Sequence, residues 1–483
     1  MTHRQDGIRA IRWSAADALL RHGINFAVML ILARLIAPAD FGLFAMMQLF
    51  VGIAAVLVDG GFGTALIQRQ AVTQQDENSV FWFSLGAGAI LFCLLILLAP
   101  AIAGFFNRPS LVPLIYAMAF NLLVTAAGAI HVTLLTKALA FRKLMQIGVA
   151  SAALSGGVSV YLALNGHGVW SLVSQAVTSS VVSLVLLWTY SAWRPTGRFS
   201  LEALQDLGRF GRYMLLSAIL DVAYGRLYTL LIGRFFAVAE LGYFWRAVTT
   251  RQMISDGLEM IVGRVAFPML SARGGDRSDL SRTTQQLLSA MMFVNVPLMI
   301  GLAVVVEPFV LVVFGEQWLP AAPVLKVLCL AGALWPLHTV NLTALMVMGR
   351  SDLFLRIEVL KKLIGLVAVI AASFHSLMAV AWVQVLVGVI AFFINAYYSG
   401  VYLAYRPLQQ LADVSPYFLA TAGMAWLLWC LEPLQNTSPV IKLFLMVSVS
   451  ALVYPLLLWL IRRDLLHTNL HLTRRMLGLA DRG

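Results

Sequence analysis

Long apolar segments follow one another along almost the whole chain, from Arg12 onward. Each is about twenty residues long, which is enough to cross a bilayer as a helix. Only 12% of the 483 residues are charged and 60% are hydrophobic, whereas a soluble protein of this size carries about a quarter charged residues. A large soluble helical core is excluded because too little polar surface remains to cover it. We therefore expect an all-α polytopic membrane protein.

Hydropathy predicts about fourteen transmembrane helices, and the second and eighth are expected to be the least apolar. The expected spans are 13–36, 41–59, 80–105, 110–136, 144–164, 168–190, 211–236, 240–262, 286–314, 321–348, 357–376, 378–402, 415–432 and 440–461.

Arginine and lysine gather in alternate connections between these spans. Cytoplasmic positive charge is the usual determinant of membrane topology, so the asymmetry predicts that both termini lie in the cytoplasm. It also accounts for most of the formal net charge of +12 without any nucleic-acid partner. The predicted cytoplasmic connections include Lys137, Arg142, Lys143, Arg194, Arg273, Arg277 and Arg282, whereas the outer ones hold Arg108 and otherwise acidic or neutral residues.

The chain contains a faint internal repeat with a constant offset of two hundred positions. Residues 34–44, RLIAPADFGLF, return as residues 234–244, RFFAVAELGYF, and Asp59 then corresponds to Glu259. Each copy joins one apolar segment to the next through a short turn. Duplicated sets of membrane helices are typical of transporters whose halves move around a central site.

The repeat predicts the domain organisation. Copies that begin near Arg12 and Arg212 hold six spans each, and an even number of spans gives both halves the same orientation. We expect an N-terminal six-helix lobe over 1–195, a second six-helix lobe over 196–410, and two extra helices with a basic cytoplasmic tail over 411–483.

Charged residues inside the predicted spans are the candidate functional residues. A charge at the centre of a membrane helix costs about 2.5–3.5 kcal/mol on insertion scales, so it tends to face an aqueous cavity. Asp17, Arg21 and Asn25 share one stripe of the first span. The predicted hydrated cavity between spans one, two, seven and eight is further lined by Asp221, Arg226, Arg246 and Arg251.

A smaller acidic set is expected to couple ions or to gate the cavity: Asp17, Asp59, Asp221, Asp256 and Glu259. For Asp59 and Glu259, at the cytoplasmic ends of their spans, helix capping and gate salt bridges are equal alternatives to ion coupling. Aromatic residues near span ends, Trp318 among them, are expected to be interfacial anchors.

Motifs for catalysis are not found. The sequence has no phosphate-binding loop, no metal-ligand spacing and no nucleophile elbow. Its three cysteines lie far apart in apolar segments. We expect no enzyme activity, no metal and no cofactor, with transport driven by an ion gradient, by the membrane potential or by consumption of the substrate on the far side of the membrane.

Several segments resemble the polysaccharide-flippase branch of the MOP exporter superfamily, which includes colanic-acid and teichuronic-acid exporters. They are 32–42, LARLIAPADFG; 58–69, VDGGFGTALIQR; 166–172, GHGVWSL; and 263–270, GRVAFPML. The resemblance covers about the first 400 residues. It implies two six-helix lobes in a V shape, two additional C-terminal helices, and a location in the bacterial inner (plasma) membrane.

The resemblance also implies transfer of an undecaprenyl-diphosphate-linked oligosaccharide from the cytoplasmic to the periplasmic leaflet, for surface or exopolysaccharide biosynthesis. Relatives use basic cavity residues for the diphosphate, and the candidates in this chain are Arg21, Arg226, Arg246 and Arg251, with Asn25 beside them. Arginine suits this task, since its planar guanidinium binds phosphate through several hydrogen bonds. Implied partners are the lipid-linked glycan, membrane lipids and polymerase or export machinery, and the duplication within one chain fits a monomer.

Two other functions remain open. An ion-coupled small-molecule antiporter of the same fold, of the multidrug type, would have a narrower and more aromatic or acidic pocket than these arginines suggest. A membrane-embedded glycan-processing enzyme would need a catalytic constellation and a larger external loop.

Overall fold

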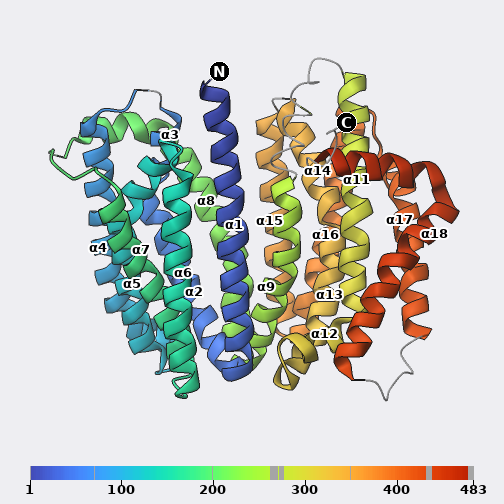
Figure 1. Ribbon diagram of the computed structural model, residues 1–483, viewed down its shortest axis with the longest axis horizontal. Coiled ribbons are helices and arrows are strands. Elements are labelled where there is room, and N and C mark those ends of the chain that lie inside the picture. The colour runs from blue at the N-terminus through green and yellow to red at the C-terminus, as the bar shows by residue number, and fades with distance from the viewer. Residues whose placement is uncertain are drawn as a thin grey trace. The chain divides into compact units, whose positions relative to one another are not determined.

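The protein is described by a computed structural model that covers residues 2–69, 71–197, 199–261, 270, 277–348, 350–430 and 438–476. Over these residues the secondary structure is helical, with no strand, so the predicted all-α fold is confirmed. Figure 1 shows long helices that run roughly alongside one another within each part of the chain. The chain divides into two compact units, Met1–Gly242 and Tyr243–Gly483.

Among its described residues, the first unit contains eight helices and the first turn of a ninth. They are α1 (Thr2–Leu35), α2 (Pro38–Asp59), α3 (Phe62–Gln68), α4 (Gln74–Phe105), α5 (Leu111–Lys137), α6 (Phe141–Leu164), α7 (Val169–Tyr190), α8 (Leu201–Phe235) and the start of α9 (Val238–Ile261). Within this unit α4 packs on α5, and α6 packs on both α1 and α7.

The second unit continues α9 and contains the later helices. They are α11 (Arg277–Val304), α12 (Val306–Val313), the 3₁₀ helix η2 (Glu316–Ala321), α13 (Ala322–Ala333), α14 (Trp335–Val347), α15 (Ser351–Ser373), α16 (Leu377–Leu403), α17 (Pro407–Cys430) and α18 (Pro439–Met476). Helix α11 is the centre of this unit, because it contacts α13, α14, α17 and α18.

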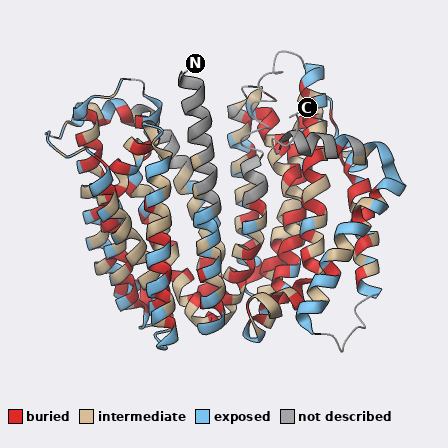
Figure 2. Cartoon of the chain, in the orientation of Figure 1, coloured by how far each residue is buried: buried red, intermediate tan, exposed pale blue. Residues whose placement is uncertain are grey.

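Burial follows this packing. Helix α11 is buried along much of its length (Figure 2). Helix α18 instead presents large exposed apolar side chains, Phe444, Leu452 and Leu460 among them. In a chain with so few charges, an apolar surface of this kind faces lipid rather than water.

Among the described residues, ten helical segments are long and apolar enough to cross a membrane. The chain is therefore a multi-pass membrane protein. Each of the fourteen expected spans falls on helical structure, but α1, α8, α9 and α15 lie outside the ten, so the count of fourteen stays a prediction. The expectation that the second span would be among the least apolar is wrong, because the segment Pro38–Gln68 has a mean hydropathy of 2.3.

The internal repeat has a direct structural counterpart where α2 and α9 begin. A Cβ atom on Gly42 would lie 2.1 Å from the carbonyl oxygen of Val238, and one on Gly242 would lie 1.9 Å from that of Pro38. Under the offset of two hundred, Gly42 corresponds to Gly242 and Pro38 corresponds to Val238, so the two contacts are equivalent. Such a reciprocal contact is what two-fold related elements make, and it requires glycine because a side chain would overlap the backbone of the other helix.

Candidate functional site

The polar stripe of α1 forms as the sequence predicts. Arg21 lies 3.3 Å from Asp17, one turn earlier, and their side chains are 48% and 18% exposed. Helix α6 supports this pair from behind: a Cβ atom on Gly148 would lie 3.1 Å from Asp17 Oδ1 and 3.3 Å from Arg21 Cδ. Asn25 follows on the next turn and is exposed. This stripe therefore presents an accessible guanidinium and an amide on one helix face.

Arg226 and Asp221 lie on α8 in the same unit. The Arg226 side chain is partly buried, and its guanidinium packs over α2, 3.4 Å from the position that a Cβ atom on Gly52 would take. Asp221 is exposed. The absence of a side chain at Gly52 thus leaves room for an arginine against α2.

Asp59 stabilises the turn between α2 and α3. Gly60 and Gly61 have positive φ angles of 60° and 74°, a left-handed conformation that glycine adopts without strain. The backbone N–H of Gly61 donates to Asp59 Oδ2 at 3.2 Å, and a Cβ atom on Gly63 would lie 2.8 Å from Asp59 Oδ1. Of the roles left open by the sequence, the contacts fit capping of α3. A role in a gate salt bridge or in ion coupling stays a prediction.

Arg246 of α9 lies in a cage of aromatic rings within the second unit. Its guanidinium carbon lies 4.7 Å from the ring centroid of Trp318, 5.0 Å from that of Phe314 and 5.8 Å from that of Trp245. Arg246 is only 1% exposed. Cation–π attraction in a desolvated setting contributes about 2 kcal/mol or more, which offsets part of the cost of burying the charge.

Trp318 corrects one expectation. The sequence predicts an interfacial anchor, but Trp318 is 0% exposed and forms one wall of the Arg246 cage. Tyr243 also packs edge-to-face on Trp318, with 6.1 Å between ring centroids. The physical reason is that η2 turns its tryptophan inward, which hydropathy does not reveal. The signal available in the sequence was the pairing of a mid-span arginine with several nearby aromatic residues.

The remaining sequence candidates are Arg251, Asp256 and Glu259. The side chain of Arg251, also on α9, packs on α13, where its Cγ and Cδ lie 3.4 and 3.3 Å from the Cβ position of Gly332. The side chains of Asp256 and Glu259 lie outside the described residues. The structure thus brings Asp17 together with Arg21 in one unit, and Arg246 together with its rings in the other.

Sequence comparison gives one family. A family model described as "Polysaccharide biosynthesis protein" matches residues 31–323. The teichuronic acid biosynthesis protein TuaB of Bacillus subtilis is 32% identical over 77% of both chains. The succinoglycan biosynthesis transport protein ExoT of Rhizobium meliloti is 29% identical over 68% of this chain and 67% of its own.

Comparison with solved structures gives the fold. The lipid II flippase MurJ, in an inward closed conformation, has a TM-score of 0.74 over 94% of this chain and 99% of its own, at 14% sequence identity. At that identity the likeness shows a shared helical architecture and carries no residue roles.

Proposed function

Because the chain belongs to the family of polysaccharide biosynthesis proteins, we propose that it is a flippase that moves an undecaprenyl-diphosphate-linked oligosaccharide across the membrane. Transfer runs from the cytoplasmic to the periplasmic leaflet by alternating access, and it supplies surface or exopolysaccharide biosynthesis. The observation that carries the proposal is the family match over more than half of a multi-pass membrane protein. The names of TuaB and ExoT, which refer to glycan biosynthesis and transport, support it.

The proposed setting is the bacterial inner membrane, with both termini in the cytoplasm. The asymmetry of lysine and arginine between alternate connections supports this orientation. Fourteen spans, arranged as lobes over 1–195 and 196–410 with an extension over 411–483, belong to the same proposal. The chain acts as a transporter and monomer, without enzyme activity or a bound cofactor, and it hands its cargo to polymerase or export machinery.

We assign the diphosphate first to Arg21 and Arg226. Arg21 is supported by its exposure and by the neighbouring amide of Asn25, and Arg226 by its position over the open side of Gly52. Guanidinium groups bind phosphate oxygens through paired, charge-assisted hydrogen bonds. Arg246 and Arg251 contribute to this site only in a conformation that frees them from their packing against aromatic rings and α13.

The proposed driving force is the membrane potential or an ion gradient. Outward movement of an anion across an inside-negative membrane is favoured by about 2.3 kcal/mol per charge per 100 mV. Coupling to Na⁺ or H⁺ would use carboxylates of the acidic set. Among these, Asp17 and Asp221 lie on the same helices as Arg21 and Arg226.

A vesicle experiment tests the proposal. The full chain is reconstituted with an undecaprenyl-diphosphate-linked oligosaccharide in one leaflet, and the appearance of the glycan in the other leaflet is followed with an added lectin. We expect transfer by the wild type, a reduction of tenfold or more for Arg21→Ala and Arg226→Ala, and wild-type rates for Arg356→Gln. Arg356 is an exposed arginine of α15 outside the proposed site.

Two outcomes would contradict parts of the proposal. If no glycan moves but small organic cations exchange against Na⁺ or H⁺, the chain is an antiporter of the same fold. If glycan transfer proceeds at one rate whatever potential is imposed, the potential is not the driving force.

A further inference from the structure

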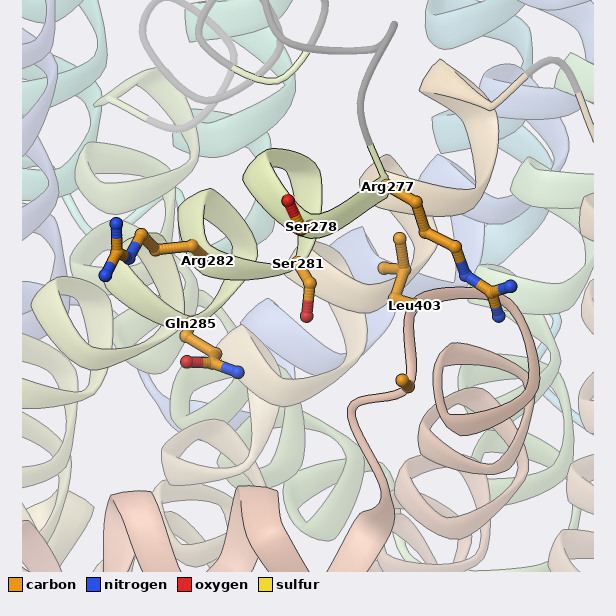
Figure 3. Close-up of a pocket in the computed structure, with 7 residues that line it drawn as sticks. Arg277, Ser278, Ser281, Arg282, Gln285 and Leu403 are labelled. Atoms are coloured by element: carbon orange, nitrogen blue, oxygen red, sulfur yellow. The ribbon is translucent and has the colours of Figure 1, made fainter.

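A second basic site lies in the later unit, at the start of α11. A pocket of about 510 Å³ is formed where the start of α11 meets the end of α16. Figure 3 shows Ser278 and Ser281 in its middle, with Arg282 and Arg277 extending to opposite sides. The residues that line it are Arg277, Ser278, Ser281, Arg282, Gln285, Leu403 and Ala404.

The chemistry of this lining suits an anion. Two guanidinium groups, two hydroxyl groups and one carboxamide supply hydrogen-bond donors, and none of the lining residues is acidic. Asp279 lies between the serines in sequence but does not line the pocket. A single phosphate is small compared with this volume, whereas a phosphate with an attached polar group fits arginines on opposite sides.

The wall of the pocket on α16 is fixed in place by contacts outside the pocket. Ala404 ends α16 with a left-handed φ of 56°. The next residue, Tyr405, donates to Asp413 Oδ2 at 2.9 Å. Gln410 and Asn341 exchange two buried hydrogen bonds of 2.8 and 3.0 Å, and Gln410 Nε2 also donates to the carbonyl oxygen of Tyr405. The corner is therefore held before any ligand arrives.

An apolar stripe runs along α16 toward the residues that line this pocket. Phe393, Tyr397 and Val401 recur every four residues on one face of α16, and all three are exposed. The stripe ends at the carbonyl oxygen of Val401, which accepts a hydrogen bond from Arg277 Nη2. A polar headgroup in the pocket would thus stand at the end of a surface suited to acyl chains.

We propose that this pocket binds the headgroup of an anionic phospholipid, with its acyl chains along the stripe of Phe393, Tyr397 and Val401. The inference goes beyond the flippase function and rests only on the orientation proposed above, which puts Arg277 and Arg282 at the cytoplasmic surface. Basic pockets between membrane helices on that side are suited to anionic headgroups, and each nearby arginine strengthens the attraction. The bound lipid would tie α11 to the end of α16.

The test measures lipid binding and not transport, so its result is independent of the flippase assay. The full chain in detergent is titrated with phosphatidylglycerol, and bound lipid is counted by native mass spectrometry. We expect Arg282→Gln to weaken the apparent affinity about fivefold and Arg277→Gln/Arg282→Gln about 25-fold. Arg356→Gln, which removes the same charge from an exposed site on α15, should bind like the wild type. Arg282 is exposed, so its single variant remains informative if the double variant does not fold.

Three results would overturn the inference. One is equal binding of phosphatidylglycerol by the wild type and both pocket variants. Another is equal retention of phosphatidylcholine and phosphatidylglycerol, which would show that charge plays no part. The third is full displacement of the lipid by millimolar inorganic phosphate, which would identify a site for a free anion in place of a lipid.

Discussion

Helices α2 and α9 are the two copies of one sequence element, and they differ in chemistry at a buried position. Both begin with the same turn, in which Gly42 and Gly242 each approach the backbone of the other copy. At positions that correspond under the offset of two hundred, α2 has Met46 and α9 has Arg246. Both side chains are fully buried. The duplication has therefore kept a backbone contact and changed the chemistry of a core side chain.

The environment of each residue explains how both are tolerated. Met46 packs in apolar surroundings, with its Cε 3.2 Å from the Cβ position of Gly233. Arg246 instead lies among Trp245, Phe314 and Trp318. Where α2 has a methionine, α9 thus has an arginine surrounded by electron-rich rings. These rings partly replace the hydration of the guanidinium. A charge within a predicted membrane span thus does not by itself mark a wet cavity.

The largest effect is expected at the shared turn. Gly242→Ala would put a methyl group 1.9 Å from the carbonyl oxygen of Pro38, so the two helices must move apart, at a cost of about 3 kcal/mol or more. Gly42→Ala should behave alike if the repeat is structurally symmetric. Thermal unfolding of the purified protein measures both. Gly157→Ala, on α6 with open space around it, is the control and should be tolerated; equal stability of all three would refute the close crossing.

The next effect separates size from charge at Arg246. Arg246→Ala leaves a cavity among the rings and should lower the free energy of unfolding by about 2–3 kcal/mol. Arg246→Met, which installs the residue of the other copy, should cost less than about 1 kcal/mol, because well-packed apolar replacements of buried charges are often neutral. If the methionine variant is as unstable as the alanine variant, the charge itself holds α9 in place.

A smaller effect measures the cage directly. Trp318→Leu removes the ring closest to the guanidinium. The substitution should lower thermal stability more when Arg246 is present than when position 246 already carries the Arg246→Met substitution. A double-mutant cycle on thermal stability should give a coupling energy of about 1–2 kcal/mol. Additive effects would mean that the rings act only by filling space.

These comparisons show what the sequence can and cannot reveal. The helices and the repeat follow from local patterns, since apolar length and a constant offset are properties of neighbouring or corresponding residues. The Asp17–Arg21 pair is equally local, because residues four apart share a helix face. The Arg246 cage is different: its rings come from α9, the residue after α12, and η2. Only the tertiary fold brings them together, so mid-span arginines of equal appearance in the sequence have unequal surroundings.

The smallest effect on stability is expected at Arg21, which is exposed whereas Arg246 is buried. Its ion pair with Asp17 is partly solvated, and exposed pairs of this kind contribute less than about 1 kcal/mol. Arg21→Ala should therefore unfold at nearly the wild-type temperature while glycan transfer falls, whereas Arg246→Ala should lose stability as well. Measuring unfolding and transfer on the same preparations separates a binding arginine from a packing arginine. A large stability loss at Arg21 would remove this distinction, because both arginines would then be structural.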